Sequence, residues 1–442
     1  MTPITLFTIH PHETQDESGK FREAFNDGYL CDTEARAIKS TSKLASQEKA
    51  TESMHIKHSI SDLQSSLTSC YHQHALAILE SGLLKASPKA FLDTNSDNTL
   101  LRAYHQMVRL RQMDNILQNA QRQGRISFYM TCRGEEAIHI GSASALDPQD
   151  VVLAQYREAG ILMWRGFTLD QFTNQCFSND RDLGRGRQMP VHYGSKALNY
   201  HTISSPLGTQ IPQAVGVAYK LKLNDAKNDI SERNVAICYF GDGCASTTDF
   251  HSGLNFAATL QTPLIFFCRN NGYAISTSVE DQYVGDGIIS RAPGYGMAAI
   301  RVDGNDLFAV HEAVRAARLY CLENSAPLLI EAMTYRQGHH STSDDSTRYR
   351  SAEELHHFTE ISDPLKRVEA FLENNGWLNS TEVAEICDEE RMGVLRAMEA
   401  AERRSPPNLD TLFLDVYRNL PEHLQKQEKE LLDHISKYPE NY

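Results

Sequence analysis

The sequence predicts an α/β fold in which a parallel sheet is flanked by helices, with a polar segment before it and a helical extension after it. Short apolar runs with the character of strands alternate with segments of helical character. Runs that are apolar throughout, rather than at every second position, are typical of strands buried on both faces of a sheet. The five runs lie at residues 151–154, 235–240, 264–268, 299–302 and 328–332.

Changes of composition divide the chain into three predicted regions: residues 1–95, 96–350 and 351–442. The first region is polar, and we expect it to be partly disordered, with weak order over residues 1–60. Residues 74–91 carry apolar side chains at helical spacing and predict an amphipathic helix. That helix could dock on a partner, on the core or on its own domain.

Helical spacing is clearest in four segments. Residues 99–119 and 135–146 are predicted to form helices that pack against the sheet. Beyond residue 350 the chain is charged, and residues 363–375 and 383–403 predict helices of an extension that serves assembly. Residues 224–232 resemble a surface insertion.

Composition limits the class of protein. The formal net charge of −14 over 442 residues argues against a nucleic-acid partner. No apolar run reaches the length of a membrane span. Nine cysteines without a CxxC spacing are typical of reduced thiols.

The first 19 residues carry the only sequence signal about location. They contain no apolar core and no arginine, but three acidic residues, Glu13, Asp16 and Glu17. This composition is unlike a secretory signal or a mitochondrial presequence, and we therefore expect a cytoplasmic protein. The alternative is a protein of the mitochondrial matrix whose presequence has been removed.

The most informative motif places a carboxylate and two amides after successive predicted strands. The tripeptide GDG at residues 241–243 follows one strand and Asn270-Asn271 follows the next, so that Asp242 and Asn271 are 29 positions apart (271 − 242). In parallel sheets, ligands bind at the carboxyl ends of the strands. The motif therefore predicts a ligand site at this edge of the sheet.

The residue types of this motif suit a magnesium ion that holds a diphosphate. Mg²⁺ prefers oxygen ligands and shares them with phosphates. Asp242 can supply a carboxylate oxygen, Asn271 an amide oxygen and the backbone of Tyr273 a carbonyl oxygen. The alternative is an ordinary βα turn with a helix-capping aspartate and a chance pair of asparagines.

The glycines and the next helix fit the same interpretation. Gly241 and Gly243 are expected to adopt positive φ and to let the backbone approach the phosphates. A helix near residues 247–258 is expected to direct its first amide groups at the anion.

Longer motifs extend the pattern over most of the chain after residue 101. They are QYREAG (155–160), GRGRQMPVHYG (184–194), SSPLGTQIPQAVG (204–216), NNGYAISTS (270–278) and MTYRQGHHSTSDDS (333–346). Together with the GDG and NN pair, they resemble the alpha subunits of branched-chain 2-oxo acid dehydrogenase (2-oxoisovalerate dehydrogenase). The resemblance implies a thiamine diphosphate-binding fold and the oxidative decarboxylation of 2-oxo acids derived from Val, Leu and Ile. The family often carries Glu at the position of Asp242, which leaves the predicted metal ligand in place.

The resemblance implies roles for two arginines and a tyrosine. Tyr156 and Arg157 would bind the cofactor, the arginine through a bidentate contact with the diphosphate. Arg157 could instead form an ion pair with Glu158 or with a neighbouring carboxylate. Arg269 could add a second cationic contact to the diphosphate, or it could pair with a neighbour in the sheet.

The loop at residues 204–210 carries two further implied sites. Ser205 and Leu207 would line the cofactor. A potassium ion would bind oxygen atoms of four residues, Ser204, Pro206, Thr209 and Gln210. The alternative is a plain loop that caps the following helix.

The resemblance also implies that His340 is a catalytic residue that reaches the diphosphate and the reacting carbons. With a pKa near its usual value, it could donate to the substrate carboxylate or stabilise an intermediate. Arg336 would help to hold its loop, and Asp344 would anchor it. Ser341 and Ser351 match positions that are phosphorylated in animal homologues, and we treat both as unmodified.

Length points to a partner subunit. Thiamine diphosphate enzymes activate the cofactor with a carboxylate from a second domain, and the predicted core here has room for only one domain. The resemblance implies a beta subunit in an α2β2 heterotetramer, which delivers acyl groups to the lipoyl arms of an acyltransferase core. The alternatives are a pyruvate dehydrogenase alpha subunit and a non-catalytic scaffold subunit.

Overall fold

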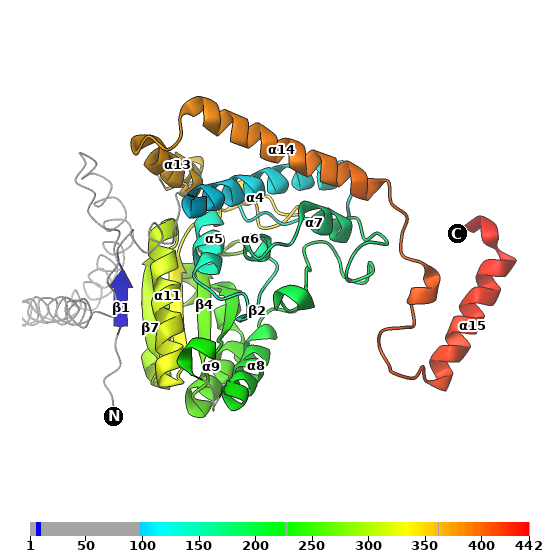
Figure 1. The fold of residues 1–442 in the computed structure, drawn as a ribbon, viewed down its shortest axis with the longest axis horizontal. Helices are drawn as coiled ribbons and strands as arrows, with labels where there is room; N and C mark the ends of the chain where they lie inside the picture. Colours follow the sequence, from blue (N-terminus) through cyan, green and yellow to red (C-terminus); the bar gives the residue numbers. More distant parts are fainter. Residues whose placement is uncertain (1–5, 10–97, 226–228, 361, 442) are drawn as a thin grey trace, which may run out of the picture.

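The computed structural model describes residues 6–9, 98–225, 229–360 and 362–441 (Figure 1). Its centre is a six-stranded sheet with the order β1-β7-β8-β4-β3-β2, in which every pairing is parallel. The strands are β1 (Leu6–Ile9), β2 (Val151–Leu153), β3 (Ala236–Gly241), β4 (Leu264–Asn270), β7 (Ala298–Asp303) and β8 (Leu328–Met333). The predicted parallel sheet is confirmed, with all five apolar runs forming strands.

Alternate side chains of the strands from β2 to β8 in this sheet point to opposite faces, and both faces are buried. In β3, Ile237 and Tyr239 belong to one apolar core, whereas Cys238 and Phe240 belong to the other. This double burial explains why the strands are apolar at every position.

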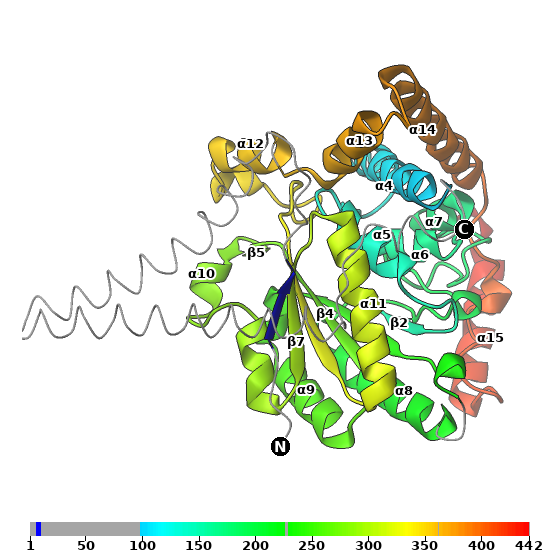
Figure 2. The same cartoon turned by 60° about the vertical axis from the view of Figure 1, so that its left-hand side comes forward.

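Different helices cover the two faces (Figures 1 and 2). On one face lie α4, α5, α6, α7 and α11, and on the other lie α8 and α9. Their bounds are α4 (Asn98–Arg122), α5 (Glu136–Ser144), α6 (Ala159–Trp164), α7 (Leu169–Cys176), α8 (Gln210–Asp225), α9 (Thr248–Leu260) and α11 (Leu307–Asn324). The helices predicted at 99–119 and 135–146 correspond to α4 and α5.

The helices after the sheet pack back onto the core before the chain leaves it. α14 lies along α4, with α13 beside its start, and α15 lies apart from the sheet near the C-terminus (Figure 1). The bounds are α12 (Ala352–Glu360), α13 (Pro364–Asn374), α14 (Ser380–Glu402) and α15 (Glu422–Lys437). α13 and α14 match the helices predicted at 363–375 and 383–403.

Side-chain caps explain where these two helices begin. Asp363 accepts hydrogen bonds from the first backbone amides of α13, and Asn379 does the same for α14 in a capping box with Glu382.

Short elements connect the main ones. A small antiparallel pair, β5 (Tyr273–Ala274) and β6 (Thr277–Ser278), follows β4 and leads into α10 (Val279–Gln282). The short 3-10 turns are η1 (Lys196–Leu198), η2 (Ile230–Glu232), η3 (Gly243–Ser246), η4 (Ile289–Tyr295), η5 (Ser346–Arg348), η6 (Leu409–Thr411) and η7 (Pro439–Asn441).

Two predictions concern residues that the structure leaves out. The amphipathic helix predicted at 74–91 lies outside the described residues, as does most of the polar region, of which only β1 is described. The division at residues 95 and 350 stays a prediction. Within the described ranges, no helix combines the length and the apolar character needed to cross a bilayer.

Candidate functional site

The carboxyl ends of β3 and β4 bring the predicted metal ligands to one edge of the sheet. Gly241 pairs with Arg269 in the strand register, so Asp242 and Asn271 follow neighbouring strands. Asp242 is buried, and its Oδ2 accepts a hydrogen bond of 2.8 Å from Gln282 Nε2 of α10. Burial raises the pKa of Asp242 above its usual range. Such a carboxylate gains from a cation that compensates its lost hydration.

The flanking glycines differ from the prediction. Neither Gly241 nor Gly243 has a positive φ, and Gly243 begins the right-handed turn η3. Gly243 is required for another reason: a Cβ there would lie 2.5 Å from the Cβ of Ala274, which is closer than two carbon atoms can pack. The positive φ expected in this region occurs instead at Gly272, with a φ of 86°.

Behind the metal ligands lies a group of buried charged and amide side chains, here named the Glu135 cluster. Glu135 is fully buried, and its Oε2 accepts from Arg269 Nη1 at 2.8 Å while its Oε1 accepts from Asn271 Nδ2 at 2.8 Å. Arg269 Nε also donates to Glu158 Oε1. The members of the cluster are Glu135, Arg157, Glu158, Arg269 and Asn271.

The Glu135 cluster shows which side chains Arg269 pairs with inside the protein. Two of its guanidinium nitrogens are held by two buried carboxylates, which lie at the starts of α5 and α6 rather than on a neighbouring strand. This pairing forms because a guanidinium that is 2% exposed requires compensating negative charge. A contact between Arg269 and a diphosphate stays a prediction.

Arg157 does not pair with Glu158, and its contact with a diphosphate stays a prediction. It donates to the backbone carbonyl oxygens of Thr131 and His340, the second at 2.9 Å. Its nearest carboxylate is Glu135, with 4.0 Å between Arg157 Nε and Glu135 Oε1. Glu158, the predicted ion-pair partner, is used by Arg269 and by the amide of Gln155.

His340 is held between two arginines. Its Nδ1 lies 3.2 Å from Arg336 Nη1 and 3.5 Å from Arg157 Nη2. Because guanidinium groups only donate, Nδ1 must be the acceptor, and the neutral ring carries its proton on Nε2. The backbone amide of His340 donates to Asp344 Oδ2 at 2.6 Å, as the predicted anchor requires.

The expected ordinary pKa of His340 is wrong. Burial, together with the positive charges of Arg157 and Arg336, lowers the pKa of His340 to about 3. The imidazole is therefore neutral at physiological pH. Tyr156 packs its ring edge-on against that of His340, with 6.2 Å between the ring centres.

The loop before α8 is more open. Ser205 is exposed, its hydroxyl lies 2.8 Å from Nε2 of the buried His192, and Leu207 is exposed as well. The hydroxyl of Thr209 donates to the carbonyl oxygen of Pro206 at 3.3 Å, so two of the oxygens predicted for potassium lie together. Gln210 turns inward and donates to the carbonyl of Tyr239 in β3.

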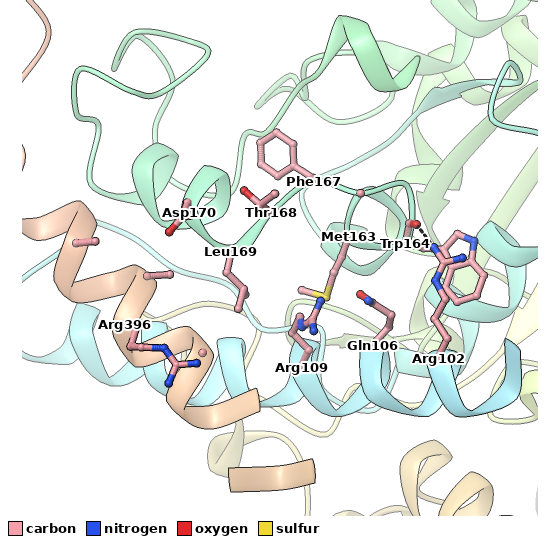
Figure 3. Close-up of a pocket in the computed structure, with 14 residues that line it drawn as sticks. Arg102, Gln106, Arg109, Met163, Trp164, Phe167, Thr168, Leu169, Asp170 and Arg396 are labelled. Carbon is pink, nitrogen blue, oxygen red and sulfur yellow. Dashed lines mark hydrogen bonds between the residues drawn. The ribbon is translucent and has the colours of Figure 1, made fainter. Parts of the chain in front are cut away.

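A cavity of about 620 Å³, here named the arginine cavity, lies elsewhere in the molecule, between α4, α7 and α14 (Figure 3). Arg102, Arg109 and Arg396 line it, together with Asp170. Arg102 stacks on Trp164, with 4.0 Å from its Cζ to the ring centre. None of the predicted site residues lines this cavity.

Sequence reasoning missed the residues that support the predicted ligands. Glu135, Gln282 and His192 each hold a site residue, but they stand in no recognisable spacing to it. Over the described ranges, no group of three or more His, Cys, Asp or Glu side chains could hold a metal ion. A metal site here therefore depends on amide and backbone oxygens beside Asp242.

Known proteins resemble this chain over the same region. The dehydrogenase E1 component family matches residues 104–410. The mitochondrial 2-oxoisovalerate dehydrogenase subunit alpha of Homo sapiens is 53% identical over 343 residues, which are 78% of this chain and 76% of the human protein. The Caenorhabditis elegans protein of that name is 53% identical over 351 residues, 79% of this chain and 80% of its own. The mitochondrial 2-oxoisovalerate dehydrogenase subunit alpha 1 of Arabidopsis thaliana is 51% identical over 347 residues, which are 78% of this chain and 72% of the Arabidopsis protein.

The chain belongs to the dehydrogenase E1 component family. Within that family these relatives are alpha subunits of 2-oxoisovalerate dehydrogenase, which agrees with the predicted branched-chain type and not with the pyruvate or scaffold alternatives. All three are named as mitochondrial proteins. Their names give no support to the cytoplasmic expectation and agree with the matrix alternative.

Proposed function

We propose that this chain is the alpha subunit of a 2-oxo acid dehydrogenase complex that decarboxylates branched-chain 2-oxo acids and passes the acyl group to a lipoyl arm. The enzyme would be a 3-methyl-2-oxobutanoate dehydrogenase with thiamine diphosphate and Mg²⁺ as cofactors. The observation that carries the proposal is 53% identity to alpha subunits of 2-oxoisovalerate dehydrogenase over 78% of the chain. We further propose the mitochondrial matrix as its location, after the names of these relatives.

The residues at the strand ends fit a magnesium ion. Asp242, the side-chain oxygen of Asn271 and the backbone carbonyl of Tyr273 are hard oxygen donors, and Mg²⁺ completes its shell with phosphates and water. Gln282 adds a buried amide oxygen that has no hydrogen-bond partner among the described residues. A buried polar atom without a partner is costly, and a hydrated cation beside it would remove that cost.

Cationic and polar groups of the chain would hold the diphosphate and the substrate. Arg157 and Tyr156 would contact the cofactor, as would Ser205, Leu207 and the backbone at residues 241–243. Bound thiamine diphosphate supplies an electron sink for the charge left when CO₂ departs. Potassium, if it binds, would occupy the loop that includes Thr209 and Pro206.

His340 would act as a neutral hydrogen-bond donor. With Nδ1 occupied by the arginines, Nε2–H is the free donor of the ring. A neutral donor can orient the substrate carboxylate and stabilise developing negative charge without first losing a proton. Arg336 and Arg157 fix the tautomer, so that the ring presents its donor from the start.

The activating carboxylate would come from a beta subunit, in an α2β2 heterotetramer that feeds a lipoyl acyltransferase core. Large apolar side chains are exposed along the segment between α14 and α15, where Leu414 is 60% and Val416 is 70% exposed. Exposed apolar patches on such extensions are typical of subunit interfaces. This supports the predicted role of the C-terminal extension in assembly.

The test is a decarboxylation assay with an artificial electron acceptor, thiamine diphosphate and Mg²⁺, on the chain co-expressed with its beta partner. We expect 3-methyl-2-oxobutanoate to exceed pyruvate in kcat/KM by about tenfold or more, because a pocket built for a branched chain gains that much from the added methyl groups. A preference for pyruvate would keep the mechanism and overturn the substrate. The alpha chain alone should be inactive, and turnover without the beta chain would refute the shared site.

A further inference from the structure

Glu135 stands at the N-cap position of α5, but its side chain makes no capping hydrogen bond. Instead its carboxylate points into the protein and is completely buried. Burying an ionised carboxylate costs several kcal/mol, so the position requires compensation from specific partners. The partners Arg269 and Asn271 lie at the carboxyl end of β4 and directly after it, and Arg157 lies in the loop after β2.

Three positively polarised groups surround this carboxylate. Arg269 Nη1 and Asn271 Nδ2 each lie 2.8 Å from one of its oxygens, and Arg157 Nε lies 4.0 Å away. Each oxygen of Glu135 therefore faces a donor, the guanidinium of Arg269 on one side and the amide NH₂ of Asn271 on the other. The carboxylate acts here as an acceptor of hydrogen bonds.

An acceptor at this place decides how the amide of Asn271 is turned. Only the NH₂ end of an amide can donate, so this end must face Glu135. The oxygen end then points the other way, where it accepts from the backbone amide of Tyr273 at 3.3 Å. The amide oxygen thus lies beside the turn that carries the third proposed ligand.

We propose that Glu135 is a positioning residue that fixes the amide of Asn271 with its oxygen toward the metal ion. The inference rests on the proposed function, because it takes Asn271 to be a ligand of Mg²⁺. Replacing a residue that orients a metal ligand from behind typically lowers metal affinity by about 10- to 100-fold.

Glu135→Gln tests this arrangement without changing the size of the side chain. One acceptor oxygen becomes an NH₂ group, and if the remaining oxygen keeps Arg269, this group faces the NH₂ of Asn271. Two donors repel each other, and the Asn271 amide relieves the conflict by turning over, which directs its NH₂ at the cation. The matched control is Glu158→Gln, since Glu158 is also buried against Arg269 but does not contact Asn271.

The measurement is the Mg²⁺ concentration at which the α2β2 enzyme binds half of its thiamine diphosphate in equilibrium dialysis. We expect Glu135→Gln to raise this concentration about 10- to 100-fold, the usual effect of a residue behind a metal ligand. Glu158→Gln should change it by less than about threefold, since a lost ion pair near the site leaves the ligands in place. Equal shifts in the two variants, or no shift in the first, would overturn the proposal.

A second substitution keeps the proposal testable if Glu135→Gln weakens the fold. Asn271→Asp alone places two carboxylates face to face and should also raise the half-saturating Mg²⁺ concentration. In the double variant, the new NH₂ donates to one oxygen of the new carboxylate and leaves the other for the metal. We expect recovery to within about twofold of the wild type. No recovery would contradict the proposal, whereas a wild-type enzyme that binds no thiamine diphosphate would refute the proposed function itself.

Discussion

Arginines gather at two places in the described part of the chain, at the Glu135 cluster and in the arginine cavity. Near the cluster, Arg157, Arg269 and Arg336 are each at most 2% exposed, and carboxylates, carbonyl oxygens or the His340 ring accept their hydrogen bonds. In the cavity, Arg102 and Arg396 are exposed (Figure 3). The buried group is the costly one, because each desolvated charge requires partners of matching geometry.

The comparison shows that the open volume and the predicted site lie in different parts of this chain. The cavity lies between α4 and α14, and two of its arginines have partners there, Arg102 on Trp164 and Arg109 on Glu390. The strand ends instead hold buried charges that pair with one another. Groups with perturbed pKa values cluster at functional sites.

The largest expected effect comes from the proposed metal ligand. Asp242→Ala should abolish Mg²⁺-dependent binding of thiamine diphosphate while the fold stays intact, because the carboxylate is the only charged ligand of the set. Calorimetric titration measures the binding of the cofactor, and circular dichroism checks that the variant is folded. Asp170→Ala in the arginine cavity is the matched control and should bind as the wild type does. Unchanged affinity in Asp242→Ala would move the site elsewhere.

The next effect concerns stability. Arg269→Met leaves Glu135 and Glu158 buried without their shared cation, and breaking a buried pair in this way costs about 3–5 kcal/mol. Urea unfolding of the purified enzyme measures the free energy of unfolding.

The cavity supplies the control for this variant. Arg396 is exposed, so Arg396→Met should change the unfolding free energy by no more than about 0.5 kcal/mol. Similar losses in the two variants would mean that the contrast between the buried and the exposed arginines has no energetic meaning.

The smallest effect is the pH dependence carried by His340. Its pKa is about 3 in the folded protein and about 6.5 in the unfolded chain, so the unfolded state binds more protons between these values. Stability from this group is complete above pH 6.5 and falls as the pH drops, by at most about 1.4 kcal/mol per pH unit. We expect His340→Gln to lose less stability than the wild type between pH 7 and pH 5, in urea unfolding at both values. Identical losses would show that the imidazole is solvated and titrates normally.

Much of the fold could be read from local patterns. The apolar runs became strands, and the helices predicted at 99–119 and 383–403 became α4 and α14 with slightly longer bounds. The spacing of apolar residues and the capping residues are signals that span only a few positions, so these elements can be predicted from the sequence. β1 was not predicted, because its four residues pair with β7, nearly 300 positions away, and show no local signal of their own.

For the site, the motif predicted the ligands but not their partners. Asp242, Asn271 and His340 were predicted from their spacing and surrounding motifs. The contacts that orient them were not found: Gln282 on Asp242, Glu135 on Asn271 and the two arginines on His340. Conformation was also misjudged at Gly243, where close packing against Ala274 rather than a positive φ requires glycine.

The sequence by itself determined the class of the fold, and it predicted the edge of the sheet where the proposed site lies and the residue types that can serve a metal and a diphosphate. Only the tertiary structure decided which donor meets which acceptor. Glu135 and Asn271 are 136 positions apart, and Arg269 reaches Glu158 across 111 positions. Such pairs form because a buried charge or amide that has lost its water needs a hydrogen-bond partner. The partner is whichever suitable group lies close in the folded structure, and the order of residues along the chain does not show which group that is.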